Sequence, residues 1–174
     1  MFSANSIAFL DFFNSNDSQK IPNNEVVTND SIDNAKKIAQ NLNTLKFSDW
    51  LLRCSIENDS ECNVIQTLIN KDNKVLFSLR VVPSKSQNFL YISAPLGISI
   101  APGIVLSFNE TTVEIPFNAC NPSGCNAIVK LDEFLLKNLT KSEKMILGIV
   151  TSNGKKLNVT ISLKGFTDAY NSML

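Results

Sequence analysis

The stretch KMILGIVTSNGKKLNVTISL, residues 144–163, indicates most directly how this chain folds. Two segments rich in aliphatic and β-branched residues flank a central SNGK, and such segments are typical of strands. The Asn153–Gly154 step between them is the strongest short-range hairpin signal in the sequence, because both residues tolerate positive φ. The stretch therefore predicts a β-hairpin.

Similar strand-like segments, separated by turn residues, fill the chain from residue 47 onward. They span 47–54, 62–69, 75–82, 89–93, 104–108, 112–117 and 126–131. Short helices are predicted at 132–138 and after residue 165, but helices of the length that parallel strands need are missing between most segments. The pattern predicts an all-β fold, a β-sandwich or barrel with short helices.

The N-terminal part of the chain differs in composition and hydrophobic pattern. Residues 14–25, NSNDSQKIPNNE, are polar and favour a tail. Apolar residues then recur three or four positions apart, with Ser31 as a possible N-cap, so a short amphipathic helix is predicted over 31–43. We accordingly predict a tail of residues 1–46 and a β domain of residues 47–174.

Composition narrows the classes of function. The chain has 174 residues, with 16 basic residues against 16 acidic ones and no histidine. A nucleic-acid partner is not expected, because the basic excess that displaces phosphate counterions is missing. The missing histidine excludes Ser-His-Asp and Cys-His catalysis. No apolar run reaches the roughly 18 residues of a spanning helix, and we expect neither a metal nor a cofactor.

The four cysteines form two close pairs, Cys54 with Cys62 and Cys120 with Cys125. Three connectivities are possible, of which proximity favours the two near-neighbour disulfides. A four-thiolate zinc site is the competing hypothesis, although the seven residues between Cys54 and Cys62 exceed the usual spacing of about two to four. Free buried thiols are the third. We predict disulfides, which form in oxidising compartments.

Two segments are candidate contact surfaces. Asn121, Pro122, Ser123 and Gly124 are all turn formers and lie between Cys120 and Cys125. A crosslink across them would give a rigid exposed tip, which loses little entropy on binding a partner. The other candidate is the bent apolar connection at 95–103, which is expected to cross the core.

Acidic residues offer the remaining route to catalysis. Asp132 and Glu133 are adjacent at the start of a predicted helix, where carboxylates favour the helix dipole. General acid–base chemistry would instead need two carboxylates facing each other in a cleft. The candidates are Asp49, Glu57, Glu61, Asp132 and Glu133. We predict a structural role for Asp132 and Glu133, and no catalytic residue.

Several motifs, in order, resemble the invasion-associated locus B family of bacterial envelope proteins. They are FSDWLLRC at 47–54, APLGISIAPGIVLSF at 94–108, PFNACNPSGCNA at 116–127 and ISLKGFTDAY at 161–170. The resemblance covers residues 47–174. It implies an immunoglobulin-like β-sandwich, export, and a contribution to host-cell invasion, and it implies no catalytic residue or cofactor.

Together these observations predict an exported, non-catalytic protein that is periplasmic, associated with the outer membrane, or secreted. Its expected partner is a protein of the envelope or of the host surface. The alternatives are a small carboxylate-dependent enzyme acting on envelope polymers and a zinc-dependent interaction module.

Overall fold

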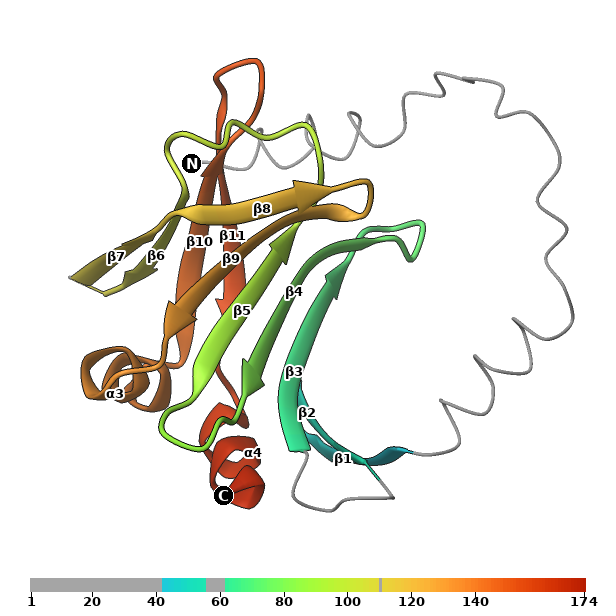
Figure 1. Cartoon of the computed structure of the whole chain (residues 1–174), viewed down its shortest axis with the longest axis vertical. Coiled ribbons are helices and arrows are strands. Elements are labelled where there is room, and N and C mark those ends of the chain that lie inside the picture. The colour runs from blue at the N-terminus through green and yellow to red at the C-terminus, as the bar shows by residue number, and fades with distance from the viewer. Residues whose placement is uncertain (1–41, 56–61, 110) are drawn as a thin grey trace, which may run out of the picture.

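Eleven strands and two short helices make up the part of the chain that the computed structural model describes, residues 42–55, 62–109 and 111–174. The strands form two sheets that enclose one core (Figure 1). The seven-stranded sheet has the order β1-β2-β3-β4-β5-β9-β8, and the four-stranded sheet has the order β11-β10-β6-β7. The predicted all-β sandwich with short helices is confirmed.

All the strand pairs are antiparallel. The seven-stranded sheet contains β1 (Leu42–Phe47), β2 (Trp50–Ser55), β3 (Cys62–Ile69), β4 (Val75–Val82), β5 (Phe89–Ala94), β8 (Phe117–Asn121) and β9 (Gly124–Lys130). The four-stranded sheet contains β6 (Ile104–Phe108), β7 (Thr111–Ile115), β10 (Lys144–Val150) and β11 (Lys156–Ser162). Strands β3, β4 and β6 have the predicted bounds, and the others differ by a few residues or divide a predicted strand. The β10–β11 hairpin turns at Gly154, with φ at 81°.

The first two strands correct the prediction of a single strand over 47–54. A turn at Ser48 and Asp49, with Ser48 at a φ of 54°, divides that region into β1 and β2. Strand β1 pairs with β2 from Leu42 onward, so the sheet includes five residues that the sequence assigned to the tail. The predicted helix 31–43 falls mostly outside the described residues, and its last two residues belong to β1.

The predicted strand 112–117 also divides, at Pro116, into β7 and β8. Because proline has no backbone N–H, it cannot donate to either strand ladder. The chain pairs with β6 before Pro116 and with β9 after it, and a register shift lies between Phe117 and Ala119. This edge segment therefore changes from one sheet to the other and joins the two layers.

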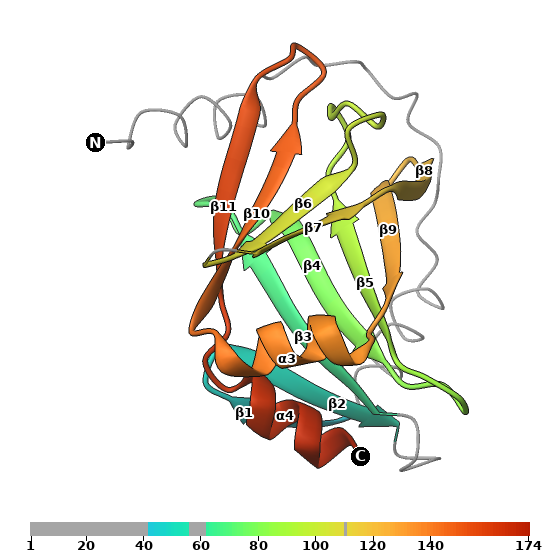
Figure 2. The same cartoon turned by 90° about the vertical axis from the view of Figure 1, so that its left-hand side faces the viewer.

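The helices α3 (Glu133–Lys141) and α4 (Phe166–Met173) lie at one end of the sandwich (Figure 2). The N-cap Asp132 accepts a hydrogen bond from the N–H of Leu135 at 2.8 Å, which satisfies a free donor of the first turn. The predicted C-terminal helix is confirmed as α4. Its Phe166 ring packs edge-on against Trp50, with 4.9 Å between ring centroids.

One hydrophobic core joins the two sheets. Phe77 and Leu79 of β4 face it from the larger sheet, and Leu106 of β6 and Leu147 of β10 face it from the smaller one, all without solvent exposure. Period-two alternation of buried and more exposed residues in β3, β4 and β5 turns every second side chain to this core. The intervening side chains form the outer face of the larger sheet.

Candidate functional site

The cysteines are bonded in the two near-neighbour pairs. Cys54 and Cys62 lie opposite each other on β2 and β3, with an S–S distance of 2.03 Å. Cys120 and Cys125 lie opposite each other on β8 and β9, with an S–S distance of 2.04 Å. Because all four sulfurs are in disulfides, no thiolate is left for zinc. The zinc and free-thiol hypotheses are therefore wrong.

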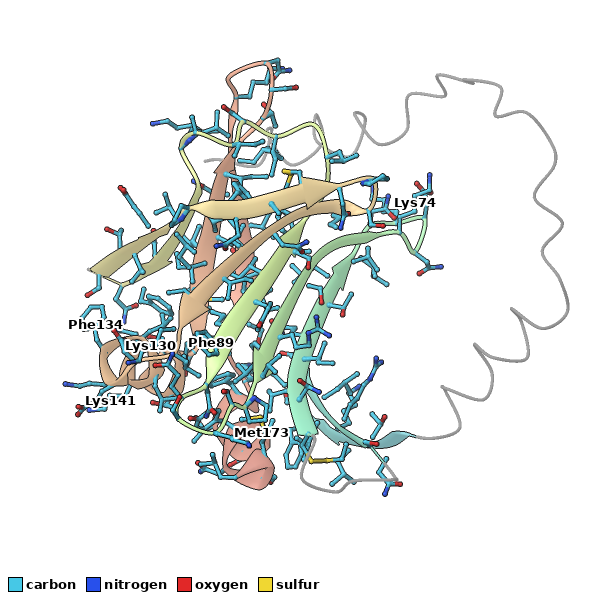
Figure 3. The ribbon with its side chains drawn as sticks, in the orientation of Figure 1. Lys74, Phe89, Lys130, Phe134, Lys141 and Met173 are labelled. Atoms are coloured by element: carbon cyan, nitrogen blue, oxygen red, sulfur yellow. A yellow bond between two sulfur atoms is a disulfide. The ribbon has the colours of Figure 1, made fainter. Side chains whose placement is uncertain are left out.

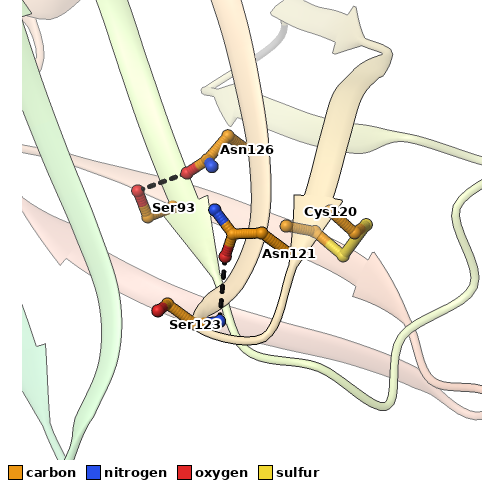
Figure 4. The surroundings of a disulfide bond; sticks show 6 residues. Ser93, Cys120, Asn121, Ser123 and Asn126 are labelled. Carbon is orange, nitrogen blue, oxygen red and sulfur yellow. Dashed lines mark hydrogen bonds between the residues drawn. A yellow bond between two sulfur atoms is a disulfide. The ribbon is translucent and has the colours of Figure 1, made fainter.

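The tip of the β8–β9 hairpin carries the first candidate contact loop. Asn121 pairs with Gly124 across a two-residue turn of Pro122 and Ser123. The Asn121 side chain accepts a hydrogen bond from the Ser123 N–H at 2.8 Å, and the Cys120–Cys125 disulfide lies one residue pair behind the tip (Figure 4). The tip is thus braced by a side-chain hydrogen bond and a covalent bond, while its first three residues are exposed.

The hairpin tip rests on the start of the 95–103 connection. A Cβ atom placed on Gly124 would lie 2.4 Å from the carbonyl oxygen of Ala94, so the two backbones are in direct contact. The next residue, Cys125, pairs with Ala94, and the β5–β9 ladder begins at this pair. The two candidate contact segments, 121–124 and 95–103, therefore lie side by side.

The 95–103 connection is in turn tied to the β10–β11 turn. The Ser99 N–H donates to the carbonyl of Val150 at 2.7 Å, and the Ser152 N–H donates to the carbonyl of Gly97 at 2.9 Å. Ile98 is buried between these bonds, whereas Leu96 is 47% exposed and Ile100 is 53% exposed. The connection therefore crosses between the sheets with one side chain in the core and two apolar side chains in solvent.

We call this assembly the loop end: the segments 95–103, 121–124 and 151–155. Figure 1 shows the 95–103 connection and the β10–β11 turn at the end of the sandwich opposite the helices. The sequence had indicated the turn at Asn153–Gly154 but not its place beside the connection. The position of this turn depends on the pairing of β10 with β6, and the residues near the turn do not indicate that pairing.

Two of the candidate carboxylates accept hydrogen bonds within the fold. Asp49 accepts a hydrogen bond from the Ser162 hydroxyl at 2.6 Å, and Asp132 caps α3. Glu133 is exposed in the first turn of α3, where its charge favours the helix dipole. Glu57 and Glu61 lie outside the described residues. The N-cap hydrogen bond of Asp132 supports its predicted structural role.

The described residues offer neither a metal site nor a membrane-spanning helix. Within those ranges, no three side chains of histidine, cysteine, aspartate or glutamate gather in a way that could hold a metal ion. Among the same residues, no helix is long and apolar enough to span a membrane.

Reduction of the protein should test the disulfides directly. The native protein is expected to contain no titratable thiol and to gain about 4 Da after denaturing reduction, which mass spectrometry measures. The double substitution C120S/C125S is expected to lower the free energy of unfolding by about 2 kcal/mol, because the unfolded chain regains the entropy of a short loop. Four thiols in the untreated native protein would contradict both pairings.

Comparison with known proteins assigns the fold and the family. The model of the family described as "Invasion associated locus B (IalB) protein" matches residues 50–174. The crystal structure of invasion associated protein b from Bartonella henselae is similar, with a TM-score of 0.67 and 22% identity over 75% of this chain and 95% of that one. No curated protein matches the sequence. Since the family model covers most of the chain and all of the sandwich from Trp50 onward, the protein belongs to the invasion associated locus B family.

Proposed function

We propose that this protein is exported to the bacterial envelope or beyond and supports host-cell invasion by binding a protein partner through the loop end. Family membership and the name of the Bartonella henselae relative support the link to invasion. The two disulfides support an oxidising location, in the periplasm, at the outer membrane or outside the cell.

One observation carries the assignment of binding to the loop end. The rigid tip, exposed at Asn121, Pro122 and Ser123, lies against a connection that presents Leu96 and Ile100 to solvent. Apolar side chains on a braced backbone contribute to binding with a small loss of conformational entropy. The structural hydrogen bonds of Asp49 and Asp132 and the missing histidine favour a non-catalytic role.

A host-cell entry assay tests this proposal. A bacterium lacking the gene is complemented with the wild-type protein, with L96S/I100S, or with F134S. Phe134 on α3 has a similar exposure, 53%, but lies away from the loop end (Figure 3), so F134S is a matched control. We expect entry with L96S/I100S to be at least about fivefold lower than with the wild-type protein, because lost interface contacts worth roughly 1 kcal/mol weaken binding by that factor. The F134S variant should restore entry to the wild-type level.

The same strains separate failure of binding from failure of export. Immunoblots of periplasmic, membrane and culture fractions should show equal amounts of the three proteins. Full entry with L96S/I100S would refute binding through the loop end. Recovery of the wild-type protein only from the cytoplasm, in reduced form, would refute export.

A further inference from the structure

The outer face of the seven-stranded sheet presents a second surface, which lies on the opposite side of the sheet from the core. Register across the strands fixes which side chains are neighbours on it. One cross-strand row is Lys46, Leu51, Ile65, Arg80, Tyr91 and Ile128. The adjacent row contains Arg53 on β2 with its partner Asn63 on β3, and Val82 on β4 with Phe89 on β5 and Lys130 on β9. We call these two rows the outer band.

Apolar side chains occupy most of the middle of the outer band. Leu51, Ile65 and Tyr91 are each half-buried, and so are the neighbouring Val82 and Phe89. On the other side of the sheet, α4 packs against the inward-facing Trp50. Figure 2 shows β3, β4 and β5 with both helices away from their outer face. In the described chain, therefore, no helix covers the band.

The charges of the outer band have one sign. Lys46, Arg53, Arg80 and Lys130 are all exposed, and Figure 3 shows Lys130 beside Phe89 at one end of the band. The Arg80 guanidinium lies 5.8 Å from the centre of the Tyr91 ring, a cation–π distance. None of the outward positions on the described strands of this sheet carries a carboxylate, although the whole chain has equal numbers of acidic and basic residues.

The smaller sheet provides an internal comparison. Its outward positions include Lys144 and Lys156 but also Glu114, so they present charges of both signs. The two sheets of one neutral chain thus differ in how they distribute charge. A band with apolar residues between cations, over which no helix of the described residues lies, matches a ligand that carries both apolar groups and negative charge.

We propose that the outer band docks an acidic, partly apolar segment of a partner protein. A protein segment fits better than a membrane, because the apolar side chains of the band are half-buried and leave little apolar surface to insert into lipid. The four cations are also spread over six neighbouring strands, from β1 to β9, whereas lipid-binding polybasic clusters usually place four to eight together. This surface is separate from the loop end, so the two proposals can fail independently.

Defined peptides test the proposal on the full-length protein. The first probe is a fluorescent 16-residue amphipathic peptide of glutamate and leucine, and matched peptides carry lysine for glutamate or serine for leucine. Fluorescence anisotropy should detect binding of the first peptide, much weaker binding of the serine peptide and none of the lysine peptide. The R53E/R80E variant should lower the affinity for the first peptide by at least about tenfold.

The matched control is K137E/K144E, which changes charge by the same amount at exposed positions on α3 and β10. Its affinity should stay within about twofold of the wild type, since these positions lie outside the band. Circular dichroism verifies that both variants are folded. NMR shift changes should map to amides around Leu51, Ile65 and Tyr91, and changes confined to other surfaces would overturn the proposal.

Further outcomes would identify a different occupant and overturn the proposal. If vesicles containing phosphatidylglycerol bind and R53E/R80E abolishes that binding while the acidic peptide does not bind, the surface recognises lipid. If a synthetic peptide of residues 1–41 occupies the band more tightly than the acidic probe does, the ligand is this chain's own N-terminal segment. Equal loss of affinity in both charge variants would show a nonspecific electrostatic effect.

Discussion

Replacing Gly165 by alanine is expected to lower the free energy of unfolding by about 3 kcal/mol or more, because it combines backbone strain with a steric overlap. Gly165 has a φ of 83°, in the left-handed region that favours glycine. A Cβ atom there would lie 2.0 Å from the carbonyl oxygen of Phe47. Side-chain rotation cannot relieve this overlap, because the Phe47 oxygen is a backbone atom and the backbone of residue 165 fixes the position of the Cβ. Urea unfolding followed by the fluorescence of Trp50 measures the change.

Gly154 provides the matched control for this substitution. Its φ of 81° is nearly the same, but apart from its chain neighbours no heavy atom of the described residues lies within 4 Å of the position that a Cβ would take. G154A should therefore cost only the backbone term, about 1–2 kcal/mol. If G165A and G154A lowered the free energy of unfolding equally, the close approach of Gly165 to β1 would not contribute to the need for glycine at position 165.

The second large effect is expected for Trp50, whose replacement by alanine should cost about 3–5 kcal/mol. Trp50 is fully buried, and its ring packs edge-on against Phe166 of α4. Its indole N–H donates to the carbonyl of Ser162 at 3.1 Å, at the end of β11. The residue thus joins β2, the C-terminal helix and the smaller sheet, and its loss leaves a cavity where all three meet.

The variant W50F separates packing from hydrogen bonding at this position. Phenylalanine keeps an aromatic ring beside Phe166 but has no N–H for the Ser162 carbonyl, which still accepts a hydrogen bond from the Gln66 side chain at 3.1 Å. W50F should therefore cost less than W50A, roughly 1–2 kcal/mol. Since these variants lack the only tryptophan, far-UV circular dichroism follows their unfolding. A loss in W50F as large as that in W50A would place the main contribution in the hydrogen bond.

Local sequence pattern was sufficient for much of the sheet structure. The segments 62–69 and 75–82 alternate in burial and end at turn residues, so β3 and β4 could be predicted to the residue. The hairpin at Asn153–Gly154 and the C-terminal helix were predicted for similar local reasons. These elements have strong signals because their own residues determine which side is buried.

Elements whose structure depends on a distant partner were missed. Strand β8, FNACN, consists mainly of exposed residues and is held by pairing with β9 and by the Cys120–Cys125 disulfide. Strand β1 lies at the edge of the sheet, and within the described residues it pairs with β2 alone. For such strands the neighbouring strand supplies most of the stabilisation, so intrinsic propensity gives a weak signal.

The sequence by itself determined the fold class, the pairs of cysteines most easily joined, and the exclusion of histidine-based catalysis. Only the tertiary structure decided how the contact segments are placed. It brought 95–103, 121–124 and 151–155 to one end through backbone contacts between separate strands. It also gathered Lys46, Arg53, Arg80 and Lys130 on one face. The reason is that strand register, set by pairing across the whole sheet, decides which residues distant in sequence become neighbours.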